Sequence, residues 1–91
     1  MTIYILMCWE ERFNEDEIIA GFRDFEDAYK RMVSMASHDN EVNNLRHNEA
    51  FFKYGEEENL ESRLYIEERS ALVDDDEGWK VKYWIKEMEL Q

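Results

Sequence analysis

The segment from residue 25 to residue 36 carries apolar side chains at the spacing of an amphipathic helix. Its members follow one another at helical intervals: Phe25, Ala28, Tyr29, Met32, Val33 and Ala36. Asp24 occupies the position of an N-cap, and acidic residues crowd the first turn, where they interact favourably with the helix dipole. The pattern predicts a helix over residues 25–37 with one face that must be buried.

The residues before this helix have the composition of paired strands. The run from Ile3 to Trp9 is apolar throughout, which is typical of an interior strand. A second strand is predicted over residues 18–23, and the charged residues 10–17 between the two predict a loop. The short connection favours an antiparallel hairpin.

The end of the chain alternates between apolar and charged residues. A half-buried strand is predicted there, after a turn at residues 74–78, and its apolar face consists of Trp79, Val81, Tyr83 and Ile85. Met88 has the opposite parity, which predicts a bulge or the end of the sheet near Glu87. Trp84 shares its parity with lysines, so it is either covered by a second layer or exposed for a partner.

The middle of the chain is the least regular part. Residues 38–48 are polar and predict a loop or a frayed extension of the helix. A second helix is the preferred prediction for residues 56–73, although Arg63 to Ile66 fits a strand about as well. The expected fold class is α+β: a small antiparallel sheet of about three to four strands with one or two helices packed on one face, in a single domain over residues 1–91.

The charge balance bounds the function more than any motif does. The chain has 23 acidic and 11 basic residues among 91, for a net charge of −12, and an aromatic content of 14% sets it apart from disordered acidic tails. Such a charge repels itself in a compact domain. It argues against direct binding of nucleic acid or of an anionic membrane surface, and it makes a basic protein the natural partner.

Clustered carboxylates are the candidate contact residues. Alternate residues on a strand lie about 6.6 Å apart, close to the gap between successive phosphates of a DNA strand, so an acidic face could dock in the Lys/Arg groove of a nucleic-acid-binding protein. The alternative is an acidic surface that only keeps the domain in solution. The candidate partner-binding residues are Glu56, Glu57, Glu58, Glu61, Asp74, Asp75, Asp76, Glu77, Glu15, Asp16, Glu17 and Trp84.

No pattern predicts catalysis, a cofactor or a metal site. From Asp74 onwards, Gly78 and Ile85 fall where an EF-hand loop would need other residues, so a calcium site is not expected. Neither histidine has the spacing of a zinc ligand. Cys8, the one cysteine, lies in an apolar strand and is expected to be a buried, inert thiol in a reducing cytoplasm. The apolar run at the start is too short to span a bilayer.

Three segments resemble a recurrent pattern in small phage and prophage proteins: MTIYILMCWEE, IIAGFRDFEDAYKRM and KVKYWIKEMEL. In that pattern an opening strand leads to a strand with a Phe-containing turn, an alanine-striped helix follows, and a terminal strand carries Tyr-x-Ile-x-x-x-x-Leu. The resemblance implies a phage context and a similar fold, with no catalytic residues. In phages, compact acidic proteins are often inhibitors of host restriction or CRISPR nucleases or of polymerases, and some resemble DNA in charge.

The functional prediction is therefore a non-enzymatic accessory protein that acts in the host cytoplasm. It would inhibit or regulate a host nucleic-acid-processing protein through its carboxylates, as DNA mimics and anti-restriction or anti-CRISPR proteins do. The alternative is an assembly module that forms a homodimer through an edge strand or through the face that carries Trp84.

Overall fold

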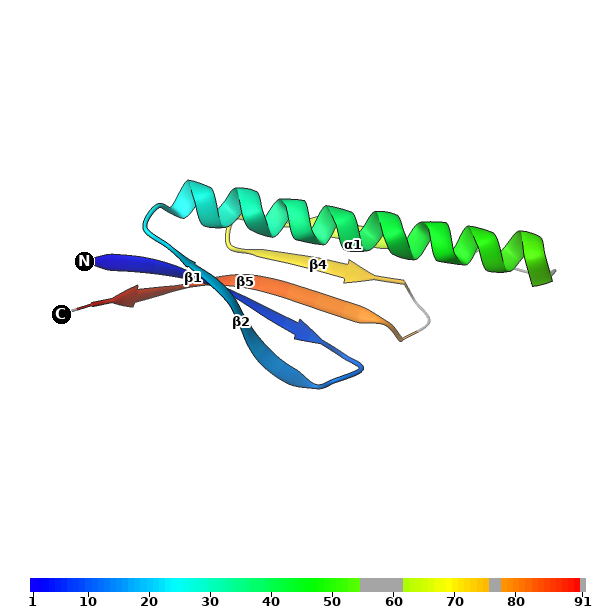
Figure 1. Cartoon of the computed structure of the whole chain (residues 1–91), viewed down its shortest axis with the longest axis horizontal. Coiled ribbons are helices and arrows are strands. Elements are labelled where there is room, and N and C mark those ends of the chain that lie inside the picture. Colours follow the sequence, from blue (N-terminus) through cyan, green and yellow to red (C-terminus); the bar gives the residue numbers. More distant parts are fainter. Residues whose placement is uncertain (55–61, 76–77, 91) are drawn as a thin grey trace.

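The computed structural model describes residues 1–54, 62–75 and 78–90, and side chains within the long helix as far as Leu45. In this part of the chain one helix lies across a single antiparallel sheet (Figure 1). The elements follow in the order β1 (Thr2–Glu10), β2 (Glu15–Phe22), α1 (Phe25–Tyr54), β3 (Arg63–Ile66), β4 (Ser70–Asp74) and β5 (Lys80–Glu89). The α+β class is confirmed, with five strands instead of three to four and one helix in the described residues.

The strands lie in the order β2-β1-β5-β4-β3, so β1 is an interior strand as its apolar run predicted. It pairs with β2 on one side and with the C-terminal strand β5 on the other. The two ends of the chain therefore lie side by side (Figure 1), and the Leu90 amide donates a hydrogen bond to the Met1 carbonyl oxygen. The pairing of the first and last strands joins the β1–β2 hairpin to strands β3–β5 in one sheet.

The hairpin of β1 and β2 is tighter than the sequence predicted. Residues 15–17 belong to β2, because pairing continues as far as the Glu10–Glu15 pair and leaves only residues 11–14 for the loop. Asn14 makes the turn with a positive φ of 51°, a conformation that asparagine tolerates better than most residues. The predicted loop over residues 10–17 is thus too long at both ends, since Glu10 belongs to β1 and residues 15–17 belong to β2.

A bulge lies in β2 and not near Glu87. Leu6 pairs with Ala20 while Met7 pairs with Ile18, which leaves Ile19 as an extra residue on β2. The register between β1 and β5 stays regular to the Thr2–Glu89 pair, and β5 ends there.

The helix begins at Phe25, as predicted, and continues to Tyr54, well past residue 37. Of the two alternatives for residues 38–48, the extension of the helix is correct. Polar contacts hold this part: the Asn43 side chain donates a 3.1 Å hydrogen bond to Asp75, and the Asn44 side chain donates one of 3.2 Å to the Ser62 carbonyl oxygen. The polar second part of the helix is therefore held by hydrogen bonds to Asp75 and Ser62 and not by an apolar stripe.

The second helix predicted for residues 56–73 is wrong where the structure describes this segment. Residues 63–66 and 70–74 form the antiparallel strands β3 and β4. Ala71 and Val73 point into the core at alternate positions of β4, and this burial at every second residue favours a strand over the predicted helix.

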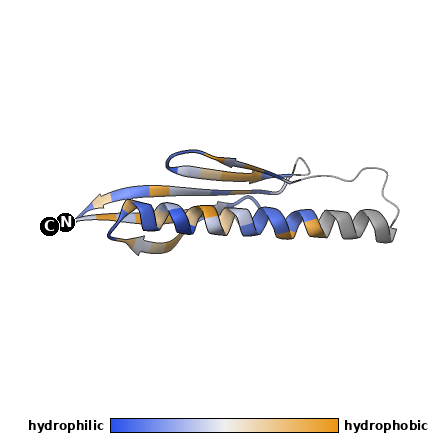
Figure 2. Cartoon of the chain, turned by 90° about the horizontal axis from the view of Figure 1, so that it is seen from above, coloured by the Kyte–Doolittle hydropathy of each residue, from blue (hydrophilic) through white to orange (hydrophobic). Residues whose placement is uncertain are grey.

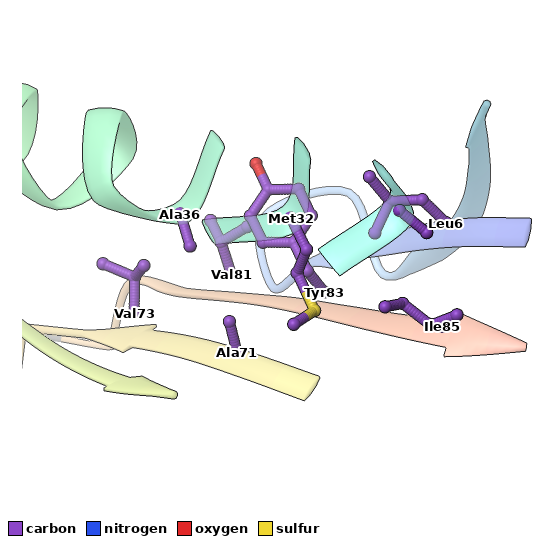
Figure 3. Close-up of a cluster of buried hydrophobic side chains, with 9 residues drawn as sticks. Leu6, Met32, Ala36, Ala71, Val73, Val81, Tyr83 and Ile85 are labelled. Atoms are coloured by element: carbon purple, nitrogen blue, oxygen red, sulfur yellow. The ribbon is translucent and has the colours of Figure 1, made fainter. Parts of the chain in front are cut away.

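The core lies between α1 and one face of the sheet. Figure 3 shows the Met32 side chain reaching from the helix towards the sheet, among side chains of β4 and β5, with Ala36 further along the same helix. The fully buried or nearly buried members are Leu6, Ala28, Met32, Ala36, Ala71, Val73, Val81, Tyr83 and Ile85. The predicted inward parity of β5 is confirmed for Val81, Tyr83 and Ile85.

Candidate functional site

The two faces of the sheet differ in what covers them. Leu6 of β1 and Tyr83 of β5 face α1, as does every second residue along each of these strands. The residues between them form what we call the open face, since no described element packs on it. The open-face residues of the interior strand β1 are Ile3, Ile5, Met7 and Trp9, and none of them is fully buried. Trp84 lies on the open face and is only partly buried, so no described second layer covers it.

On the helix side, the β1–β2 hairpin gathers carboxylates around a shallow hollow. Its lining residues, which we call the carboxylate hollow, are Cys8, Glu10, Phe13, Glu15 and Glu17. The strand register explains the gathering, because Glu10 pairs with Glu15 and Cys8 pairs with Glu17. Directly opposed side chains in an antiparallel pair lie about 5 Å apart, so each of these positions presents its side chain to the same small region.

Two carboxylates of the hollow face solvent. Glu15 and Glu17 are exposed, and within the described residues no cation is paired with either of them. Glu10 differs, because Arg12 approaches it at 3.1 Å and the indole of Trp79 donates a 3.2 Å hydrogen bond to it. Glu15 and Glu17 are therefore the members most available to a cationic partner.

Cys8 of the hollow pairs across the strands with Tyr83, which is hydrogen-bonded to the helix. The hydroxyl of Tyr83 donates to a carboxylate oxygen of Asp39, which comes from α1. Burial, together with the hydrogen bond to Asp39, raises the pKa of Tyr83. The phenol thus stays protonated and holds Asp39 against the sheet beside Cys8.

The Cys8 thiol has a raised pKa. Its pKa is raised to about 11, first by burial and then by the charges of Asp39, Glu17 and Glu10, while contact with Tyr83 lowers it in part. A thiol with this pKa stays protonated near neutral pH and is a poor nucleophile. Cys8 is half-buried rather than fully buried, so its low reactivity comes from acidic neighbours as well as from its apolar strand.

An exposed aromatic ring stands at the rim of the hollow. The Phe13 side chain is 60% exposed, and the Arg12 guanidinium lies 4.9 Å from the centre of its ring. Rigid aromatic side chains next to charged groups are common contact residues in protein interfaces. The hairpin tip therefore offers an apolar contact beside the carboxylates.

The structure separates the predicted site residues that it describes. Glu15 and Glu17 lie on the helix side, while Asp16, between them, points to the open face opposite Trp9. Asp74 also lies on the open face, where its strand neighbours are Arg63 and Lys80. The remaining predicted surface residues lie outside the described part of the chain: Glu56, Glu57, Glu58, Glu61, Asp76 and Glu77.

Asp75 is a correction to the predicted acidic surface. It is almost completely buried, and it accepts 3.1 Å hydrogen bonds from the Asn43 side chain and from the backbone amide of Trp79. The carboxylate therefore joins the turn between β4 and β5 to the helix. A partner cannot reach it without opening this junction.

Asp39 was not among the predicted contact residues. Glu10 belongs to the charged segment 10–17, and a hairpin loop shortened to four residues places it opposite Glu15, so its position beside the carboxylates follows from the register. The position of Asp39 does not follow from the sequence, because it depends on how α1 lies on the sheet.

Comparison with known proteins finds no matching protein family, no similar curated protein and no similar solved structure. Within the described residues, no set of side chains has the arrangement of a metal site. In the described part of the chain, no helix is both long enough and apolar enough to cross a membrane.

Proposed function

We propose that this chain is a non-enzymatic, phage-type accessory protein that binds a basic surface of a host nucleic-acid-processing protein. The contact is made by the carboxylate hollow, with Glu15 and Glu17 as its charged residues and Phe13 as its apolar one. The observation that supports the proposal is the gathering of Glu10, Glu15 and Glu17 around one small hollow. Burial first, and then the charges of Asp39, Glu17 and Glu10, raise the pKa of Cys8 in the same region.

The geometry suits a partner that normally binds phosphates. Glu15 and Glu17 are alternate residues of one strand, so their carboxylates are spaced at about 6.6 Å, near the separation of successive phosphates. A Lys/Arg groove that binds a nucleic-acid backbone would meet a similar row of negative charge here. The contact would inhibit the partner by occupying that groove, and the long-range attraction would make association fast and sensitive to salt.

The test is capture of partners from a bacterial lysate on the immobilised protein, with mass spectrometry of the proteins released by a salt gradient. We expect basic nucleic-acid-binding proteins that elute as salt rises and that added duplex DNA displaces. The variant Glu15→Lys/Glu17→Lys should lose them, because it replaces attraction by repulsion.

The matched control is Glu67→Lys/Glu68→Lys, in the turn between β3 and β4, where both side chains are exposed. Each double variant changes the net charge from −12 to −8, since each substitution adds two units. If both double variants lose the same partners equally, overall charge and not the hollow governs binding. If neither does, the proposal is wrong.

A further inference from the structure

The open face carries an uninterrupted apolar stripe along β1. All four of its open-face side chains are apolar, from Ile3 to Trp9. The stripe is flanked by Ile18 of β2, whose side chain is 70% exposed, and by Trp84 of β5. An antiparallel sheet that faces water on one side normally alternates polar residues onto that side, and contiguous apolar patches mark interaction sites.

The sheet register places these residues in rows that run across the strands. One row contains Lys82 of β5, Trp9 of β1 and Asp16 of β2, which pair in turn. The next contains Trp84, Met7 and Ile18. A third contains Lys86, Ile5 and Gly21. In every row an apolar residue of β1 separates two unlike side chains.

We propose that the open face binds a second copy of this chain, with a two-fold axis that runs along β1 between the two sheets. Such an axis keeps each row in place along the strands and exchanges the two sides of β1. It lays β5 of one copy over β2 of the other, while the stripes of the two β1 strands face each other.

This arrangement makes each row complementary to its copy. Lys82 faces Asp16 of the second copy, so charges of opposite sign meet at both ends of the row. Trp84 faces the exposed Ile18, and Lys86 faces Gly21, which has no side chain to obstruct it. No other element of the described fold has to move to allow these contacts.

A hollow on the open face supports the same occupant. It is lined by Trp9, Asp16, Arg69, Ser70, Lys82, Trp84 and Ile85. The proposed axis places Ile18 of the second copy above this hollow, in the row of Trp84. A protruding side chain and the depression that receives it thus occur on the same surface, as a two-fold interface requires.

Edge-to-edge pairing of strands fits the structure less well. The outer strand β2 carries Glu15, Asp16 and Glu17 in succession, and charged side chains on an edge strand oppose pairing with another chain. The opposite edge strand, β3, is only four residues long. The sheet face is therefore the better surface for self-association.

The overlap is small, so the dimer should be reversible. Three strands about 4.8 Å apart and a stripe roughly 20 Å long outline a patch of roughly 300 Å² per copy, smaller than the roughly 800 Å² per partner of a standard interface. The two copies also repel each other through their net charge of −12. Screening by salt should therefore strengthen the dimer, whereas binding of a basic partner by the carboxylate hollow should weaken.

The test uses sedimentation equilibrium or light scattering of the full chain, from about 5 to 500 µM, at low and high salt. We expect a monomer–dimer equilibrium that shifts towards the dimer in high salt. The single variants Asp16→Lys and Lys82→Asp should each weaken association by roughly tenfold or more, because like charges then face each other at two symmetric places. The double variant Asp16→Lys/Lys82→Asp should restore it.

Restoration by the double variant identifies the contact between Lys82 and Asp16 of the second copy, since Trp9 separates the two side chains within one chain. Ile5→Glu should abolish the dimer, and Lys30→Glu, on the exposed side of the helix, is the control that should not. Circular dichroism of each variant checks that it folds. A wild-type monomer at every concentration and salt level, or a double variant as weak as the singles, overturns the proposal without affecting the test of the carboxylate hollow.

Discussion

At the residue scale, single side chains of the helix side hold the molecule together through polar contacts as well as apolar ones. Asp75 is buried and joins the β4–β5 turn to α1 through Asn43. Tyr83 combines a ring in the core with a hydroxyl bonded to Asp39. Buried polar groups must be paired to be tolerated, so these contacts fix where the helix lies on the sheet.

The raised pKa of Cys8 predicts slow alkylation of the folded protein. A shift from an ordinary value of 9.0 to about 11 lowers the thiolate fraction near pH 8 by about a hundredfold, and the thiolate is the reacting species. Iodoacetamide should therefore modify the native chain about a hundredfold more slowly than the chain in urea. The native rate should rise with pH up to about 11.

The comparison needs a control for steric protection. Glu17→Gln removes one of the charges that raise the pKa of Cys8 while keeping the size of the side chain. This variant should react faster at pH 8. Equal rates for the native chain and the chain in urea would show that the thiolate is not suppressed.

At the scale of elements, α1 is the one layer that covers the sheet in the described structure. Its first half contributes apolar side chains and its second half contributes asparagines, so the helix is held by two kinds of contact along its length. Figure 2, viewed from above, shows hydrophobic and hydrophilic residues alternating along the described part of the helix. The sheet depends on the apolar half for its core.

Met32→Ala should reveal that dependence. Met32 lies on the face of α1 that meets the sheet and is fully buried (Figure 3). Truncation of such a residue costs about 2–4 kcal/mol through lost burial and the cavity that remains. The free energy of unfolding in urea should fall by this amount. Arg31→Ala, at the preceding and exposed position of the same helix, should change it by less than about 0.5 kcal/mol. A loss for Met32→Ala below about 1 kcal/mol would mean that the core around it repacks.

At the scale of the whole molecule, shape and charge are both uneven. The described chain measures 57 × 23 × 16 Å, and its radius of gyration of 15.4 Å exceeds the roughly 12 Å expected for a compact domain of this length. The helix extends past the strands at one end (Figure 1). The lysines of β5 lie on the open face, while Glu15 and Glu17 face the opposite side.

Self-repulsion predicts that salt stabilises the monomer. With a net charge of −12, an increase from about 20 to 500 mM NaCl shortens the Debye length from roughly 20 to 4 Å. The free energy of unfolding should rise by about 1 kcal/mol, measured in urea at a protein concentration low enough to keep the chain monomeric.

The matched variant for this measurement neutralises four exposed glutamates: Glu15→Gln, Glu17→Gln, Glu67→Gln and Glu68→Gln. It changes the net charge from −12 to −8, since each of the four substitutions adds one unit, and its response to salt should be smaller. Stability that decreases with salt would indicate that favourable ion pairs outweigh the repulsion.

The elements that could be predicted are those whose pattern is strong over a short range. The helical spacing from Phe25 to Ala36, the apolar run of β1 and the alternation of β5 each follow from local burial requirements, and the structure confirms all three. The open-face position of Trp84 also followed from its parity with the lysines. The place of residues 15–17 could not be predicted in this way. They are strand residues because β1 and β2 stay paired as far as Glu10 and Glu15, which only the structure shows.

The amino-acid sequence by itself determined the fold class, the interior position of the first strand, the buried face of the last strand and the excess of negative charge. The tertiary structure decided that residues 63–66 and 70–74 are strands, that Asp75 is buried and that Asp39 joins the carboxylates of the hairpin. The physical reason is that periodicity records which side of an element is buried, whereas partners distant in sequence determine which element forms and which charged groups meet.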